Sequence, residues 1–175
     1  MQLQPGEVER FREVQPMHRN VLIRYLVPIE AVVVSAIILP LGLTRGGADQ
    51  TTLLVIWFLC AIVLPLGIAF GFRLTTVVTD RRLVATFRPF VSKKIDLDQI
   101  ESAEAVKYSP LMDAGGWGVK HSRKFGSVLN VAGEHGVFVR YTKNGKPKKM
   151  LVGSEHPGEI ADAVGKPPAG DADAG

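Results

Sequence analysis

Two apolar stretches decide the fold of this chain: LVPIEAVVVSAIILPLGL at residues 26–43 and TLLVIWFLCAIVLPLGIAFGF at residues 52–72. A helix needs about 20 apolar residues to cross the hydrocarbon core of a bilayer, and both stretches have that length. Only helices and closed barrels satisfy their own backbone hydrogen bonds in lipid. The sequence therefore predicts two membrane-spanning helices, at residues 21–43 and 51–72, joined by a tight external loop at residues 44–50.

Basic residues beside the apolar stretches predict how the helices cross the membrane. Because Lys and Arg accumulate in cytoplasmic flanks, we expect a multi-pass protein of the cell membrane with both chain ends in the cytoplasm. A cleaved signal peptide is the alternative for the first stretch, but the polar arm at residues 1–20 is long for one. The flanking residues are Arg10, Arg12, Arg19 and Arg24 before the first stretch and Arg73, Arg81 and Arg82 after the second, whereas the loop holds only Arg45.

The charge of the chain lies beyond the two apolar stretches. From Arg73 onward the sequence holds sixteen Lys and Arg against twelve Asp and Glu, which accounts for the net charge of +4 over all 175 residues. A mild basic excess beside a membrane suits an anionic lipid surface. It is too small and too dispersed to indicate nucleic-acid binding. The one cysteine, Cys60, lies inside the second apolar stretch, so no disulfide within the chain is possible.

After residue 72 the pattern changes to short β-branched segments separated by turn residues. Strands at residues 73–79 and 83–88 flank a turn at Asp80-Arg81-Arg82. Asn144-Gly145 is the strongest hairpin signal, because both central residues of such a turn adopt positive φ. An amphipathic helix after Pro157 should end at Gly165.

We therefore expect a mainly-β cytoplasmic domain at residues 73–165, with about seven strands and one C-terminal helix. A strongly bent sheet of that size leaves an open end, which a terminal amphipathic helix can close. This combination predicts a small β-barrel. The composition of residues 166–175 predicts a disordered tail.

Several short motifs in this segment resemble a known family, the membrane-flanked PH-domain group, whose PH-like domains are carried on small bacterial and archaeal membrane proteins. The resemblance covers residues 74–164 and the preceding helical hairpin, but not the arm at residues 1–20. It rests on VVTDRRL at 77–83, which is similar to an x-x-T-x-x-R-L hairpin, on IDLDQI at 95–100, similar to the I-x-L-x-x-I that follows, and on GWG at 116–118, GVFV at 136–139 and the helix after Pro157.

Members of this family are mostly uncharacterised, so the resemblance implies a fold more than a site. It implies a PH-like barrel of about seven strands with a C-terminal helix. It also implies a binding or scaffolding module, and it carries over no catalytic residue.

The residue pattern offers no catalytic constellation. Ser154-Glu155-His156 contains the residue types of a triad, but sequence neighbours cannot point at one another as a triad requires. Gly115, Gly116 and Gly118 lack the strand–loop–helix context of a dinucleotide site. We expect no enzymatic activity, no cofactor and no metal site. None of the four histidines, His18, His121, His135 and His156, has a zinc-site spacing to another ligand.

Two surfaces of the cytoplasmic domain are candidates for binding. The first is a basic face near the membrane, where each exposed Lys or Arg can add about 1 kcal/mol of attraction to an anionic leaflet. The alternative is ordinary positive-inside topology with a solvated surface. The residues of this predicted basic face are Arg73, Arg81, Arg82, Lys93 and Lys94.

The second candidate is the loop at residues 108–120, with Tyr108, Met112 and Trp117 as the residues that would contact a partner. A long loop with an aromatic residue and several glycines often carries binding. The alternative is that Trp117 packs into the domain.

Glu30 is an acid roughly one turn inside the first apolar stretch. An ionisable residue within a membrane helix is by default a hypothesis for a functional site. The alternative is that Glu30 lies at the interface, where it pairs with Arg24 or faces water.

The leading hypothesis is a membrane-anchored, non-catalytic interaction or scaffold module that binds a protein partner or the anionic lipid surface, with a homo-oligomer as a further option. The alternative hypothesis is a small subunit of a transporter or channel, in which the helical hairpin is the working part and Glu30 matters.

Overall fold

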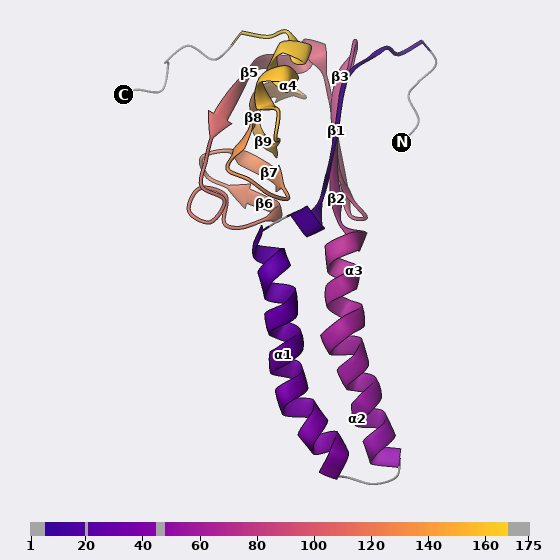
Figure 1. Ribbon diagram of the computed structural model, residues 1–175. Helices are drawn as coiled ribbons and strands as arrows, with labels where there is room; N and C mark the ends of the chain where they lie inside the picture. The colour runs from indigo at the N-terminus through magenta and orange to yellow at the C-terminus, as the bar shows by residue number, and fades with distance from the viewer. Residues whose placement is uncertain (1–5, 20, 45–47, 168–175) are drawn as a thin grey trace. The chain divides into compact units, whose positions relative to one another are not determined.

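The computed structural model describes residues 6–19, 21–44 and 48–167 (Figure 1). The chain forms two compact units: a β-rich unit, made of the segment up to Gln15 together with the segment from Arg73 onward, and a helical unit at Pro16–Phe72. The predicted external Arg45 and most of the predicted disordered tail fall outside the described residues.

The helical unit confirms the two predicted apolar helices. A short 3-10 helix at Met17–Arg19 leads into α1 at Val21–Thr44. The second helix consists of α2 at Ala48–Phe58, a π-helical turn at Leu59–Val63 and α3 at Leu64–Gly71. Windows of 18 and 22 residues are long and apolar enough to cross a membrane, and only 0% and 17% of them are buried. The core helix of a soluble protein would instead be largely buried.

Pro65 gives a physical reason for the π-helical turn. A proline has no N–H, and its ring collides with the carbonyl four residues earlier, here that of Ala61. The turn before it is widened, so that the Leu64 N–H donates to the carbonyl of Leu59, five residues back. A π-type turn thus accommodates the proline without ending the helix.

A side-chain hydrogen bond between described residues joins the two apolar helices. Trp57 Nε1 on α2 donates to Ser35 Oγ on α1 at 2.8 Å. The same hydroxyl donates to the carbonyl of Ala31 at 2.6 Å, so both polar groups are satisfied between the helices. A polar contact of this kind fixes the register of two helices that otherwise present apolar faces.

The first sheet of the β-rich unit has the order β1-β2-β3-β4. Its strands are β1 at Glu9–Pro16, β2 at Arg73–Thr79, β3 at Arg82–Arg88 and β4 at Val91–Asp96. Strand β1 comes from the polar arm, for which the sequence predicted no strand. The strands that precede and follow the helical hairpin are therefore neighbours in one sheet.

The second sheet has the order β5-β8-β9-β7-β6, with β7 and β9 parallel. Asn144 and Gly145 have φ of 54° and 71° and form the β8–β9 turn, which confirms the predicted hairpin. A short 3-10 helix at Leu97–Gln99 leads into this sheet, whose strands are β5 at Ile100–Lys107, β6 at Gly118–Ser122, β7 at Gly126–Asn130, β8 at His135–Lys143 and β9 at Lys146–Gly153.

The C-terminal helix α4 at Pro157–Val164 packs against both sheets, because it contacts β2, β5 and β8 (Figure 1). Ile160 and Val164 bury its apolar face. Gly165 ends it as predicted, with φ of 67° and its N–H bonded to the Ala161 carbonyl. The mainly-β domain with a terminal helix is confirmed, with eight strands after the helical hairpin instead of about seven. Neither sheet closes on itself within the described residues, so the PH-like barrel stays a prediction.

A largely buried ion pair ties Glu7, just before β1, to Arg82, the first residue of β3. Arg82 Nη2 donates to one oxygen of Glu7 at 2.7 Å, and Arg82 Nε lies 2.7 Å from the other. The side chains of Glu7 and Arg82 are only 1% and 14% exposed. The hydrogen bond with Glu7 raises the pKa of Arg82. Backbone contacts add to this anchor, since the Val8 N–H donates to the Asp80 carboxylate and the Asp80 N–H donates to the Val8 carbonyl, both at 3.0 Å.

The other end of β1 is tied to the residues that follow β9. Glu13 accepts hydrogen bonds from Ser154 Oγ at 2.6 Å and from the Glu155 N–H at 2.8 Å. Gln15 Nε2 donates to the Gly153 carbonyl at 3.3 Å. The hydroxyl of Ser154 also accepts the N–H of His156 at 2.9 Å. This segment therefore holds β1 in place against the second sheet.

Replacing Glu7 by Gln should destabilise the β-rich unit by about 3 kcal/mol, because the loss of one partner leaves the other charge buried and uncompensated. The measurement is the urea dependence of amide hydrogen exchange in β2 and β3 of the full-length protein in a mild detergent. In the Glu7→Gln variant, the urea concentration at which half of the exchange protection of β2 and β3 is lost should be lower than in the wild type.

Glu9→Gln is the matched control for this change. Glu9 pairs with Arg12 at 2.6 Å, but the two side chains are 31% and 42% exposed. An exposed pair of this kind contributes about 0–1 kcal/mol. Equal losses of stability in the two variants would show that Glu7 is not the anchor of β1.

Candidate functional site

Three arginines line a groove on one face of the first sheet. Because side chains alternate between the faces of a strand, residues two apart share a face. Register places Arg73 opposite Arg88 and Thr75 opposite Thr86. The groove has a volume of about 180 Å³. This arginine groove is lined by Arg12 and Val14 of β1, Arg73 and Thr75 of β2, and Thr86 and Arg88 of β3.

The arginine groove holds more positive than negative charge. Arg12 is paired with Glu9, and their hydrogen bond raises the pKa of Arg12 and lowers that of Glu9. Arg73 and Arg88 are exposed, and no hydrogen bond or ion pair joins either one to another described residue. Like charges directly opposite each other across an antiparallel pair repel. An anion bound between these two guanidinium groups would relieve that repulsion.

The structure separates the arginines of the predicted basic face. Arg73 lies in the arginine groove at the start of β2. Arg81 and Arg82 lie at the other end of the hairpin, about 20 Å away along the strands at 3.3 Å per residue. Arg82 is moreover engaged with Glu7. These three residues therefore do not form one patch.

The two lysines of the predicted basic face lie on β4. Lys93 and Lys94 are both exposed, and they pair with Ala85 and Val84 near the middle of β3. They lie outside the arginine groove, about 10–13 Å along the strands from Arg88.

Arg12 and Arg88 are not among the candidate site residues that the sequence predicts. A signal for Arg88 was present, because a two-residue turn at Asp80 and Arg81 makes Thr79 the neighbour of Arg82 and so places Arg73 opposite Arg88. The predicted strand instead began at residue 83, which shifts the pairing by one residue. Arg12 had no local signal, since its place depends on the pairing of β1 with a strand that follows both helices.

The loop at residues 108–120 does not present its three candidate residues together. Tyr108 is 3% exposed and packs in an aromatic cluster, 6.2 Å from the ring of Phe125. Burial raises the pKa of Tyr108, and the Asn130 side chain opposes this shift in part. Met112 is 89% exposed, whereas Trp117 is half-buried. Only Met112 is therefore fully available to a partner.

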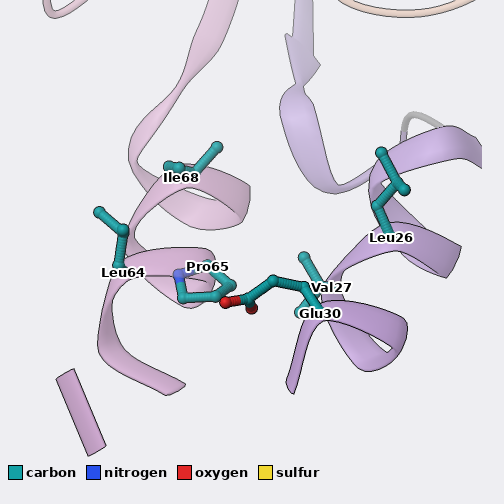
Figure 2. A pocket seen from close by; sticks show the side chains of 6 residues that line it. All are labelled: Leu26, Val27, Glu30, Leu64, Pro65 and Ile68. Carbon is teal, nitrogen blue, oxygen red and sulfur yellow. The ribbon is translucent and has the colours of Figure 1, made fainter. Parts of the chain in front are cut away.

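Glu30 lines an apolar pocket between α1 and α3 of about 240 Å³. Figure 2 shows its carboxylate directed towards Pro65. Its Oε2 atom is buried and has no hydrogen-bond partner among the described residues. No ion pair joins Glu30 to Arg24 in the described part of the chain. The other lining residues are Leu26, Val27, Leu64 and Ile68.

The described residues contain no group of three or more His, Cys, Asp or Glu side chains that could hold a metal ion. No model of a known protein family matches the sequence, and comparison with characterised proteins and with solved structures gave no significant match. The resemblance to the membrane-flanked PH-domain group therefore rests on the sequence motifs alone.

Asp113 organises the loop that follows β5. Its Oδ2 atom accepts the Ser109 N–H at 2.8 Å, and Lys124 Nζ lies 3.4 Å from Oδ1. The hydrogen bond from Ser109, with a smaller contribution from Lys124, lowers the pKa of Asp113.

We expect the hydrogen bond between the Ser109 N–H and the Asp113 carboxylate to be lost only when the pH falls below the ordinary Asp pKa of about 4. Since the folded-state pKa is depressed, the stabilisation is complete above the unfolded pKa and is lost as pH falls through the folded one. An NMR titration of the Ser109 amide should report this midpoint. Asp113→Asn should abolish the titration, and an unchanged curve in that variant would assign it to another group.

Proposed function

We propose that this protein is a membrane-anchored, non-catalytic interaction module whose β-rich unit contacts the anionic lipid surface through the arginine groove. The observation that carries the proposal is the position of Arg73. This residue begins β2 and follows the helical hairpin after a single residue, Phe72.

Covalent geometry limits how far Arg73 can lie from the end of the second apolar helix. Helix α3 ends at Gly71, and two residues of extended chain span about 7 Å. The headgroup layer on each side of a bilayer core is about 5–7 Å thick. If α3 ends at the edge of the hydrocarbon core, Arg73 lies at the level of the lipid phosphates. Arg88 is its register partner, with a Cα atom about 5 Å away.

The chemistry of the arginine groove suits lipid phosphates. A guanidinium group stays charged and can donate two parallel hydrogen bonds to a phosphate. Each cation near an anionic leaflet adds about 1 kcal/mol. Two or three such residues give a weak contact, which is sufficient to orient a domain that the helices already tether.

The proposed topology places both flanks of the helical hairpin on the cytoplasmic side. Strand β1 precedes the first helix, strand β2 follows the second, and the two strands pair in one sheet. Strands that pair must lie on the same side of the membrane. The arginine bias of the flanks assigns that side to the cytoplasm.

A protein partner is a second binding hypothesis for this module. Leu111 and Met112 leave 64% and 89% of their surfaces exposed beside each other in the loop after β5. Adjacent exposed apolar residues on a loop suit a protein contact, including one with a second copy of the chain. Co-purification of the full-length protein from native membranes in mild detergent would identify a stoichiometric partner.

Hydrogen exchange in lipid nanodiscs tests the proposed lipid contact. Amides of β2 and β3 beside the arginine groove should exchange roughly tenfold more slowly in discs with anionic lipid than in zwitterionic discs, because lipid phosphates hold two guanidinium groups. Arg73→Gln/Arg88→Gln should abolish this difference. Lys146→Gln/Lys148→Gln, which removes the same charge from the exposed β8–β9 hairpin, should preserve it.

A further variant separates the arginine groove from the wider basic face predicted from the sequence. If Lys93→Gln/Lys94→Gln abolishes the slowing and the arginine variant does not, β4 carries the lipid contact. Equal exchange in both kinds of disc for the wild-type protein would rule out the proposal.

The alternative function is a small subunit of a transporter or channel. It is favoured by the buried Oε2 atom of Glu30 beside Pro65, where the helix contains a π-helical turn. Interrupted helices with an ionisable residue are typical of ion and substrate paths in membranes.

Glu30→Gln distinguishes the two functions. A pH-sensitive dye inside proteoliposomes measures proton entry under an imposed gradient. The transporter hypothesis predicts flux by the wild-type protein that falls by about tenfold or more when the ionisable group is lost. The interaction module predicts no flux in either protein and the same anionic-lipid effect in both.

A further inference from the structure

A second basic hollow lies on the other sheet of the β-rich unit. It has a volume of about 450 Å³ and is formed by β5, β8, β9 and the segment that precedes β7. Its floor contains Val106, Phe125 and Phe138. Among its described lining residues, the cations of this basic hollow are Lys107, Arg123, Lys124, Arg140 and Lys149, and the carboxylate is Glu104.

Two of these cations are positioned by aromatic rings. Lys124 Nζ lies 4.9 Å from the ring centroid of Phe125, and Arg140 Cζ lies 5.4 Å from that of Phe138. The two rings are 4% and 6% exposed, and their centroids are 5.3 Å apart in an edge-to-face arrangement. Each cation–π contact restricts where the charge can lie. The rings of the core therefore hold two positive charges in place before any ligand arrives.

The register of β8 and β9 places a third cation beside them. Arg140 lies directly opposite Lys149. Two like charges at directly opposed positions destabilise a pair of strands. A bound anion would offset this repulsion.

Carboxylates around the basic hollow neutralise only part of its charge. Lys107 lies 3.5 Å from Glu134, and Lys124 lies 3.4 Å from Asp113. Glu104 is the third carboxylate. Arg123 and Lys149 form no ion pair with another described residue, which leaves two positive charges of the basic hollow without a paired carboxylate.

We propose that the basic hollow binds a phosphate-bearing ligand with at least two negative charges, such as a diphosphate group. Phosphate oxygens accept several charge-assisted hydrogen bonds at once, and Arg and Lys are the side chains that supply them. The excess of positive charge matches such a ligand. Because aromatic rings already position Lys124 and Arg140, less side-chain entropy is lost when the ligand binds. The site is distinct from the arginine groove, since the two share no residue.

Titration calorimetry of inorganic pyrophosphate into the full-length protein, held in zwitterionic phosphatidylcholine nanodiscs, tests this proposal. We expect saturable binding that Arg123→Gln/Lys149→Gln weakens by about tenfold or more, because each lost phosphate contact costs about 1 kcal/mol or more. Both side chains are exposed and neither lies over a ring, so the fold should persist. Lys93→Gln/Lys94→Gln, which loses the same charge on β4, should bind as the wild type does.

A second experiment, in nanodiscs that contain a phosphorylated phosphatidylinositol, distinguishes a free phosphate ligand from a lipid headgroup. Binding of pyrophosphate assigns a free ligand. Slower hydrogen exchange of β8 and β9 in the lipid arm alone, lost in Arg123→Gln/Lys149→Gln, assigns a lipid headgroup. The proposal is overturned if neither arm responds, if citrate binds as tightly as pyrophosphate, or if both double variants weaken binding equally.

Discussion

The pairing of β1 with β2 is the constraint on which the rest of the structure depends. The two apolar stretches form helices, α1 and the α2–α3 helix, and contribute no strand to either sheet. The chain leaves β1, runs through both helices and re-enters the sheet at β2. The helical hairpin is therefore an insertion between two neighbouring strands. Its ends are drawn together accordingly, as the hydrogen bond from the Met17 N–H to the Phe72 carbonyl shows at 2.9 Å.

Polar contacts, more than apolar burial, attach β1 to the rest of its unit. Half of the residues of the strand are exposed, and Gln15 is its one buried residue. It is held instead by the carboxylates of Glu7, just before the strand, and Glu13, near its end, which accept hydrogen bonds from Arg82 at the start of β3 and from the residues after β9. Burying a carboxylate is costly unless its oxygens are paired. The carboxylates of Glu7 and Glu13 therefore stabilise the fold, and their hydrogen bonds determine where β1 lies.

Strand register, and not total charge, creates the two basic sites. A net charge of +4 over the chain indicates little by itself. The antiparallel pairing of β2 with β3 brings Arg73 and Arg88 together, and that of β8 with β9 brings Arg140 and Lys149 together. In both cases like charges face each other directly, which costs stability unless an anion or a carboxylate compensates. Arg82, by contrast, is neutralised by Glu7 and belongs to the architecture of the fold.

The amino-acid sequence by itself determined the features that depend on local interactions. The two apolar helices follow from length and hydropathy, the β8–β9 turn from the positive φ of Asn144 and Gly145, and the end of α4 from Gly165. Only the tertiary structure decided that the polar arm forms a strand, because its partner β2 lies beyond both helices and the arm has little apolar pattern of its own. It also decided that Tyr108 is buried and that Arg12 and Arg88 accompany Arg73. These outcomes depend on pairing between distant segments, where a one-residue change in register moves a side chain to the other face.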